Sequence, residues 1–387
     1  MPKNHPRCPV CSSKMKRNGT TSKGTTRWRC TTCGASSTNT RPDRAYAANF
    51  NVFIDHVTGK LSMTECAKQH GVSRWTLNRR FDTFWYIQIP DHLDRYRIHD
   101  QIFIDGTHTG AGLLLIACTD THVINWVWVK SESTKAYRKL LEPLQAPLVV
   151  VLDGGKGAYS AIKQCWPSTR IQRCLVHAQR VVRQYVTSRP RTDAGRAIYK
   201  LALKLTNINT VKEAAEWTAR LQEFHSVYRT YMNQKTRNPD TGAMTFTHDR
   251  VRKAYNSLAN LERNKWLFGY LQPPPEGLAT TKWASTTNRL EGGFNSPLKD
   301  LAKLHRGRSG EHQRLMLDWW LYLRTQAHEN PADIARRANW GRDALAKVNT
   351  TPQQNTGNQE TGRPALYDNA IGDEYSHNLG IQKGWLH

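Results

Sequence analysis

Two acidic residues follow strongly apolar runs in the middle of the chain. Residues 98–105 read IHDQIFID and end on Asp105, and residues 148–153 read LVVVLD and end on Asp153. Short apolar runs of this kind predict buried strands. If the two strands are neighbours in one sheet, both carboxylates meet at one edge, where carboxylate oxygens suit a divalent metal ion. The alternative for either aspartate alone is an ordinary turn residue at a strand end.

The residues after Asp153 suggest a second chemistry, because GGKGA resembles part of a phosphate-binding loop. A Walker-type loop needs G-x-x-x-x-G-K-[ST]. Here no Ser or Thr follows Lys156, and no glycine stands at the required distance before it. We therefore interpret the glycines as a sharp turn after the strand. Asp153 becomes the functional candidate, and Lys156 becomes a candidate contact to a DNA phosphate.

Alternating strand and helix patterns surround the two aspartates. Residues 98–185 contain apolar runs such as AGLLLIACTD and helical patterns such as STKAYRKLLEPL, which together predict an α/β domain with a mixed sheet. Residues 186–280 are charged with helical spacing, so we expect an all-α insertion that ends near PPPEG. The α/β domain then resumes over 281–330. Residues 331–387 are polar and predict a flexible tail.

The charge of the chain indicates a polyanionic partner. The 387 residues carry a formal net charge of +25, and the pI is about 9.9. This charge favours a nucleic acid or a membrane surface as the partner. No apolar run has the length that spans a bilayer, and the first residues do not resemble a signal peptide. We therefore expect a soluble, cytoplasmic protein that binds nucleic acid and no membrane.

Residues 1–42 contain two C-x-x-C pairs, Cys8 with Cys11 and Cys30 with Cys33. Each pair directs two thiolates at one ion, and two pairs complete a tetrahedral site. The polar residues between the pairs are too few to form a core, so we expect one structural Zn²⁺ to hold this ribbon together. A redox motif would need only one pair. The many basic residues nearby suit contact with nucleic acid, although a ribbon that only supports its neighbour is the alternative.

Residues 43–92 predict a helix-turn-helix. Ser62 and Glu65 form an S-x-x-E capping box, Gly71 ends the first helix, and Ser73 caps the second. The alternative is an ordinary helical hairpin with a basic, solvated face. In a helix-turn-helix, the second helix enters the major groove of duplex DNA. It would then present Arg74, Trp75, Thr76, Asn78, Arg79 and Arg80.

Four motifs occur in order along the chain: IDGTH, VLDGG, RCLVHAQR and TTNRLEGGFN. Together they resemble the DDE transposases of bacterial insertion sequences, in the group related to the eukaryotic Mutator elements, over residues 98–325. The resemblance implies an RNase H-like fold with a helical insertion before the helix that carries the glutamate. It also implies that Asp105, Asp153 and Glu291 form the catalytic, metal-binding triad.

The resemblance also implies a chemistry and its partners. Two Mg²⁺ ions, or Mn²⁺, activate the nucleophile and stabilise the leaving oxygen of a phosphodiester. Water cleaves at the element end and frees a 3′-OH, which then attacks target DNA. The partners would be double-stranded DNA, as the terminal inverted repeats and the target, and a second copy of the chain in a homodimer or larger assembly. A bacterial, nucleoid-associated protein fits this expectation.

Glu291 has an alternative structural interpretation. Asn288-x-x-Glu291 is also a capping-box pattern. In addition, Pro297 falls where the helix of the family continues, which predicts a kink or a restart at Ser296 and leaves an inactive copy as an alternative.

Cys174 and His177 match the C-x-x-H element of the same family. A lone pair lacks two ligands for zinc. We therefore expect a hydrogen-bonded pair that anchors the insertion near the active site, with a plain buried pair as the alternative.

Two other functional classes remain open. A DNA-binding regulator derived from an inactive transposase would keep the zinc ribbon and the helix-turn-helix but would have lost carboxylates, and all three are present. An RNase H-like nuclease that acts on RNA is less suited to a helix-turn-helix, because the major groove of an A-form duplex is too narrow for a helix.

Overall fold

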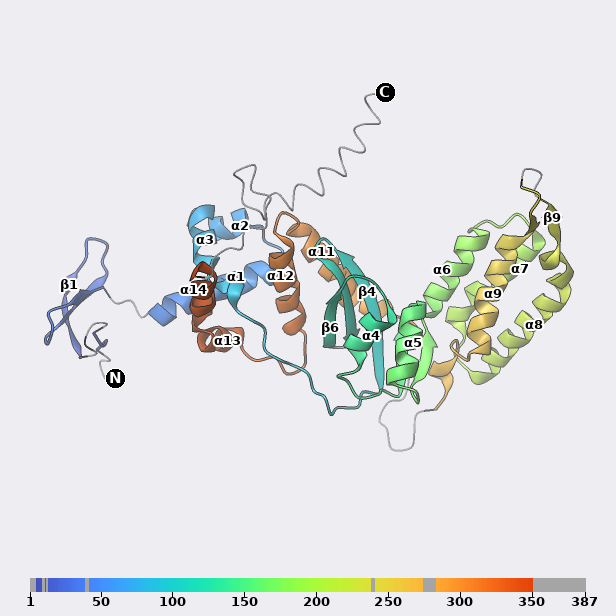
Figure 1. Ribbon diagram of the computed structural model, residues 1–387, viewed down its shortest axis with the longest axis horizontal. Helices are drawn as coiled ribbons and strands as arrows, with labels where there is room; N and C mark the ends of the chain where they lie inside the picture. Colours follow the sequence, from blue (N-terminus) through green and yellow to red (C-terminus); the bar gives the residue numbers. More distant parts are fainter. Residues whose placement is uncertain are drawn as a thin grey trace, which may run out of the picture. The chain divides into compact units, whose positions relative to one another are not determined.

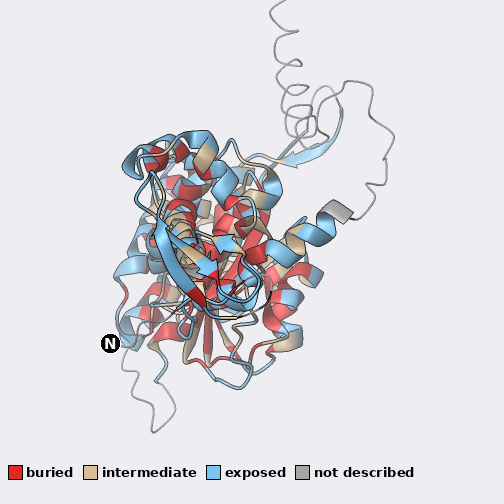
Figure 2. Ribbon diagram, turned by 90° about the vertical axis from the view of Figure 1, so that its left-hand side faces the viewer, coloured by how far each residue is buried: buried red, intermediate tan, exposed pale blue. Residues whose placement is uncertain are grey.

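The computed structural model describes residues 5–8, 11, 13–38, 42–237, 241–273 and 283–350. Its contacts divide the chain into two units (Figure 1). The first unit contains Met1–Asp91, Leu304–Leu323 and Ala327–His387, and the second contains His92–Lys303 and Arg324–Gln326. In each unit the buried residues lie in the strands and on the inward sides of the helices (Figure 2).

A small antiparallel sheet forms the N-terminal part of the first unit. Its strands β1 (Met15–Thr20), β2 (Thr26–Cys30) and β3 (Ser36–Ser37) lie in that order. Its buried cluster consists of Cys8, Met15 and Cys30, with Trp28 and Ala35 packed against them. So small an apolar cluster cannot offset the entropy of ordering the segment, which leaves the cysteines as the main source of stability.

Three helices follow: α1 (Pro42–Thr58), α2 (Met63–Gln69) and α3 (Arg74–Phe81), with a 3₁₀ turn at Phe84–Tyr86. The predicted capping box is confirmed, because the Ser62 hydroxyl accepts from the Glu65 amide and the Glu65 carboxylate accepts from the Ser62 amide. Ser73 caps α3, and Gly71 makes the turn at φ +60°. The helix, turn and helix therefore begin and end where the sequence predicts.

Three C-terminal helices belong to the first unit, and the first two of them pack on α1. They are α12 (Gly310–Tyr322), α13 (Pro331–Arg337) and α14 (Arg342–Thr350), with a 3₁₀ turn at Asn339–Gly341. The predicted flexible tail is therefore wrong for residues 331–350, and the rest of it lies outside the described residues. Trp340 is 2% exposed and stacks on Tyr46, which explains why this polar segment is ordered.

Residues of α12 also correct a predicted domain limit. We expected 281–330 to belong to the α/β domain, but Leu304–Leu323 lies in the first unit. The reason is aromatic packing, since Trp319 is fully buried and meets Phe50 of α1 edge to face at 5.9 Å between ring centroids.

A five-stranded mixed sheet forms the centre of the second unit. The strands are β4 (Gln101–Thr109), β5 (Gly112–Cys118), β6 (Val123–Val129), β7 (Val149–Leu152) and β8 (Arg170–Arg173), in the order β6-β5-β4-β7-β8. β4, β5 and β6 are antiparallel neighbours, whereas β4, β7 and β8 run parallel. This arrangement confirms a mixed sheet.

Two helices cover one face of this sheet, α4 (Thr134–Leu141) and α5 (Lys156–Cys165) (Figure 1). Alternate residues of β4, Ile102 and Ile104, point into the apolar core beneath these helices. The prediction that β4 ends at Asp105 is wrong, because the strand continues to Thr109 and pairs with β5. Asp105 therefore lies within a strand, on the face opposite to Ile104.

The insertion between β8 and Glu291 is mainly helical. Its helices are α6 (Leu175–Val186), α7 (Asp193–Lys204), α8 (Val211–Asn233) and α9 (Asp249–Arg263), with 3₁₀ turns at Leu205–Asn207 and Gly269–Leu271. These helices lie side by side around a shared apolar core (Figure 1). The prediction of a purely helical segment is wrong in one detail, since β9 (Lys235–Arg237) and β10 (Met244–Phe246) form a short hairpin.

The chain then returns to the sheet through a continuous but irregular helical segment. A short α turn, α10 (Asn288–Leu290), leads into a π turn at Glu291–Asn295 and then into α11 (Ser296–Leu304). A π turn accommodates one extra residue within a helix and often lies at a functional site. The segment thus passes Pro297 without a break, and the irregularity falls on Glu291 itself.

Candidate functional site

Asp105 and Asp153 occupy equivalent positions on two adjacent parallel strands. Ile104 of β4 pairs with Leu152 of β7. Asp105 is the next residue within β4, and Asp153 is the first residue after β7 ends. Both aspartates are half-buried. The two predicted strands are therefore neighbours, and the sheet brings the two carboxylates to the same level of its carboxyl edge.

Polar groups hold the Asp105 carboxylate in place. Its Oδ1 accepts the Gly106 amide at 2.8 Å, and its Oδ2 accepts the Nδ2 amide of Asn295 from the π turn. Burial raises the pKa of Asp105, and the nearby charge of Asp153, followed by that of Glu291, raises it further. Carboxylates that repel one another in this way are stabilised by a cation between them.

The turn after Asp153 adopts the conformation that only glycines tolerate well. Gly154 and Gly155 have φ of +119° and +115°, which agrees with the interpretation of GGKG as a turn. Lys156 follows as the first residue of α5 and is exposed. Burial raises the pKa of Asp153, and the Arg173 guanidinium opposes that increase.

Glu291 carries the third carboxylate, from the start of the π turn. Its Oε1 lies 3.3 Å from His177 Nε2 and 3.4 Å from Arg180 Nη1. The capping-box alternative is wrong, because the residue before the helix is Thr287 and no side chain caps it. Within the described residues, the three carboxylates do not form a group whose oxygens all lie within 4.8 Å of one another. The charge of Glu291 nevertheless acts on both aspartates.

Cys174 and His177 both contact the segment that carries Glu291. The Cys174 thiol, which is buried, accepts from the amide and from the hydroxyl of Thr287, each at 3.3 Å. The amide of Leu175 donates to the carbonyl of Ser285 at 3.1 Å. The start of α6 therefore fixes the approach of the chain to Glu291, although no bond joins Cys174 to His177 among the contacts of the described residues.

The residues at this edge offer oxygen ligands for a divalent cation. Asn295 is 3% exposed, and its Oδ1 has no hydrogen-bond partner within the described part of the chain although its Nδ2 contacts Asp105. A buried amide oxygen without a partner is costly unless a ligand completes it. Carboxylates with an amide oxygen form a donor set that Mg²⁺ accepts, so the residues present fit this ion.

Sequence reasoning missed three polar residues at this edge: Asn295, Arg173 and Glu132. Asn295 lies in the TTNRLEGGFN motif, four residues after Glu291, which is a spacing that places both on one side of a helical turn. Arg173 is the last residue of β8 and lies next to Gly154. Glu132 follows β6 and approaches Gly106. Only the Asn295 spacing gave a signal that the sequence alone could supply.

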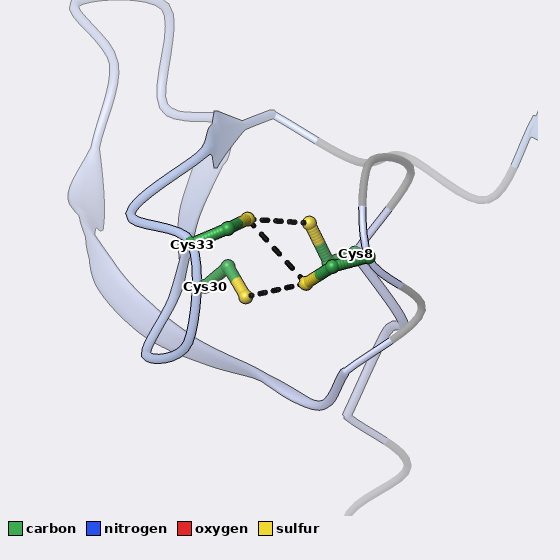
Figure 3. Close-up of side chains that lie close together, drawn as sticks. Cys8, Cys30 and Cys33 are labelled. Atoms are coloured by element: carbon green, nitrogen blue, oxygen red, sulfur yellow. Dashed lines mark hydrogen bonds between the residues drawn. The ribbon is translucent and has the colours of Figure 1, made fainter.

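The four N-terminal cysteines form a second candidate site (Figure 3). Their sulfurs all lie within 4.8 Å of one another, and Cys8 and Cys11 each approach a cysteine of the other pair at 3.4 Å. Backbone amides, chiefly that of Cys33, donate to the Cys30 sulfur and lower its pKa to about 6. Four cysteine sulfurs at this spacing fit a tetrahedral Zn²⁺.

The predicted DNA-facing residues lie on α3. Trp75 is 68% exposed, and the Arg79 guanidinium lies 4.7 Å from the centroid of its ring. Arg80 reaches Asn49 of α1 at 3.5 Å, and Asn78 accepts from Arg308 at 3.5 Å. The helix therefore presents an exposed aromatic and basic surface, and no helix of the described residues is long and apolar enough to cross a bilayer.

Comparisons with known proteins give a family match for part of the chain. A search of curated proteins found no match. The model of the family described as "Transposase, Mutator family" matches residues 119–265, which extend from the β5–β6 turn to the end of α9. This match covers the second part of the sheet and most of the helical insertion. The chain thus carries a Mutator-family transposase domain at residues 119–265.

Proposed function

We propose that this protein is a DDE transposase that binds the ends of an insertion sequence, cleaves DNA there and joins the freed end to target DNA. The observation that carries the proposal is the equivalent placement of Asp105 and Asp153 on adjacent parallel strands, with Glu291 approaching from the π turn. The strand order, with three antiparallel strands followed by two parallel ones on the other side of β4, is that expected of an RNase H-like fold. The Mutator-family domain supports the same reaction class.

Three carboxylates would act together on the scissile phosphodiester. Asp105 and Asp153 would hold Mg²⁺ from two strands, and Asn295 would keep Asp105 oriented through its amide. When bound, Mg²⁺ or Mn²⁺ stabilises negative charge on the attacking and leaving oxygens of a phosphodiester. The Arg180 side chain is 56% exposed, so a DNA phosphate can compete with Glu291 for the guanidinium and release Glu291 toward the aspartates.

The reaction proposed has two steps that need no covalent intermediate on the protein. In the first, water attacks the phosphorus at the element end, the bond from phosphorus to the 3′ oxygen breaks, and that oxygen leaves as a hydroxyl after it takes a proton. In the second, the new 3′-OH attacks a phosphodiester of the target and displaces its 3′ oxygen. Cys174, through Thr287, and His177 would position the Glu291 segment for both steps.

DNA recognition would belong to the first unit. A zinc-bound ribbon and the exposed face of α3 are both basic, and the whole chain carries +25. The Arg79 guanidinium, which lies over the Trp75 ring, would contact the major groove of DNA together with that ring. Arg80 would add a further positive charge to this surface. Lys156, exposed beside Asp153, would contact a backbone phosphate at the cleavage site. Action on two ends would require at least a dimer on DNA.

Strand cleavage tests the proposal. The substrate is a labelled duplex that contains the terminal repeat of the element, incubated with wild type, Asp105→Asn, Asp153→Asn and Glu291→Gln in Mg²⁺. We expect each variant to bind the duplex normally and to lose cleavage by at least about a thousandfold, on the order of 4 kcal/mol in activation free energy. A wild type that binds the duplex but cleaves in neither Mg²⁺ nor Mn²⁺ would instead indicate a DNA-binding regulator.

A further inference from the structure

Glu132 is a fourth acidic residue close to the proposed catalytic edge. It stands between β6 and α4, one residue before Ser133, whose hydroxyl caps α4 by accepting from the Ala136 amide at 3.2 Å. The cap fixes where the chain leaves the sheet. Glu132 itself is an exposed residue in the short connection between β6 and α4.

Glycines beside both aspartates leave room for the Glu132 carboxylate. A Cβ atom at Gly106, the residue after Asp105, would lie 2.6 Å from Glu132 Oε1. A Cβ atom at Gly155, two residues after Asp153, would lie 4.0 Å from Glu132 Oε2. The carboxylate therefore lies against the backbone of both aspartate-bearing segments.

The backbone of Glu132 is equally close to the turn after Asp153. A Cβ atom at Gly157, in the first turn of α5, would lie 2.6 Å from the carbonyl oxygen of Glu132. Three glycines, Gly106, Gly155 and Gly157, thus lie beside a single glutamate, where a side chain would approach it. Any larger residue at Gly106 or Gly157 would displace it.

One oxygen of Glu132 is anchored and the other is available. The hydroxyl of Tyr137, a residue that is 2% exposed, donates to Oε2 at 3.2 Å. Among the described residues, no donor is bonded to Oε1, which is the oxygen nearer to Gly106. A buried tyrosine therefore orients the carboxylate so that Oε1 faces the strand that carries Asp105.

Three carboxylates come near one another at this edge, because Glu132 lies beside Gly106 and Gly155, which neighbour Asp105 and Asp153 in the chain. An independent sign of a missing ligand is the buried Asn295 Oδ1, which has no partner within the described chain and whose amide contacts Asp105. Repulsion among three carboxylates and an unsatisfied amide oxygen are both relieved by a bound divalent ion.

We propose that Glu132 supplies a further carboxylate to the divalent-cation site formed by Asp105 and Asp153, with Oε1 directed at the cation or at water bound to it. This inference rests on the proposed function, because it assumes that the two aspartates hold a metal ion. A Mg²⁺ site uses few carboxylates and several waters, so a carboxylate held by Tyr137 fits beside the two aspartates without closing the site to a DNA phosphate.

Metal binding by the full chain tests the proposal without using activity. The zinc-loaded protein is titrated with Mn²⁺ in the absence of DNA, and the free Mn²⁺ is measured by its electron paramagnetic resonance signal. The variant Glu132→Gln keeps the acceptor for Tyr137 but removes the charge. Glu142→Gln is the matched control, since Glu142 ends α4 and pairs with Arg138 on the surface.

We expect Glu132→Gln to weaken Mn²⁺ binding by at least about tenfold, Asp153→Asn to weaken it further, and Glu142→Gln to leave it unchanged. In cleavage, Glu132→Gln should raise the Mg²⁺ concentration that gives half-maximal rate by a similar factor. The thermal midpoint of this variant, zinc-loaded and without added Mg²⁺ or Mn²⁺, should equal or exceed that of wild type, because a repulsive charge has been removed. Should Glu132→Gln fail to fold, Glu132→Asp can be tested instead. It keeps the carboxylate on a side chain that is one methylene shorter, and we expect an intermediate loss of Mn²⁺ affinity.

The outcomes separate this inference from the proposed function. Mn²⁺ binding that Asp153→Asn weakens and Glu132→Gln leaves unchanged would overturn the role of Glu132 alone. Mn²⁺ binding that neither variant changes would overturn the metal site itself, and with it both proposals.

Discussion

His56 makes the stability of the first unit depend on pH. It is 1% exposed, its Nδ1 donates to the Leu61 carbonyl at 3.1 Å, and its Nε2 accepts from Arg308 at 3.3 Å. The bond to Arg308 requires the neutral ring, because a proton on Nε2 would face the guanidinium, whereas Nδ1 can donate to Leu61 in either state. Burial lowers the pKa of His56 to about 4, and the nearby His305 and Arg308 add to the effect.

The direction and the size of this change in stability follow from the pKa values of His56 in the unfolded and in the folded chain. The unfolded chain takes up a proton near pH 6.5, whereas the folded chain resists until about pH 4. The unfolded state therefore binds more protons within this window, and stability is lost as the pH falls through it. Linkage between these values gives a loss of about 2 kcal/mol between pH 7.5 and pH 5 from His56 alone.

Urea unfolding at pH 7.5 and pH 5.0, followed by tryptophan fluorescence, measures this loss. Trp85 and Trp319 report on the same unit. We expect the wild type to lose about 2 kcal/mol more on acidification than His56→Gln does, while His70→Gln, at an exposed position, behaves as the wild type. Equal losses in the wild type and in His56→Gln would show that His56 is not held neutral by burial, and the reasoning would fail.

Three further results are expected. Cys30→Ser should reduce bound zinc from one ion per chain to none, and the dispersed amide signals of the ribbon in an NMR spectrum should disappear. The reason is that the metal supplies most of the stability of the ribbon, on the order of 10 kcal/mol. A ribbon that keeps dispersed amide signals without zinc would contradict this expectation. Arg79→Ala should weaken binding to duplexes of any sequence and reduce the salt slope by about 1, as read from fluorescence anisotropy, and an unchanged slope would exclude a phosphate contact. Trp217→Ala should destabilise the second unit by about 3–5 kcal/mol in calorimetry, because Trp217 is 2% exposed and donates to the Leu201 carbonyl; a loss below 1 kcal/mol would show that the helical core does not depend on it.

Elements with a local cause could be predicted from the sequence. The capping box at Ser62, the turn at Gly71 and the apolar run before Asp153 each carry their signal within a few residues. The juxtaposition of Asp105 and Asp153 could be predicted only conditionally, since it depends on which strands are neighbours. The pairing of β4 with β7 supplied that condition.

Elements with a tertiary cause could not be predicted. Residues 331–350 read as polar, yet Trp340 orders them by packing on Tyr46, almost three hundred residues away in sequence. The end of β4 was predicted too early, because Gly106 and the polar residues after it resemble a turn. Thr107 is in fact 1% exposed and pairs with Leu114.

The supporting residues of the candidate site were the hardest to find. Glu132 belongs to no motif, and its position is set by the space that Gly106 and Gly155 leave for it. Asn295 contacts Asp105 only because a π turn intervenes after Glu291. Such contacts join segments far apart in the chain, so the sequence offers at most the spacing from Glu291 to Asn295 and not the contacts themselves.

Anomalous scattering from crystals of the protein bound to an element-end duplex, soaked with Mn²⁺, tests the central claim most directly. We expect a manganese peak that is coordinated by oxygens of Asp105 and Asp153, with Glu291 turned from Arg180 toward the same site. A DNA complex in which the scissile phosphate lies elsewhere, or in which no peak appears between the two aspartates, would contradict it.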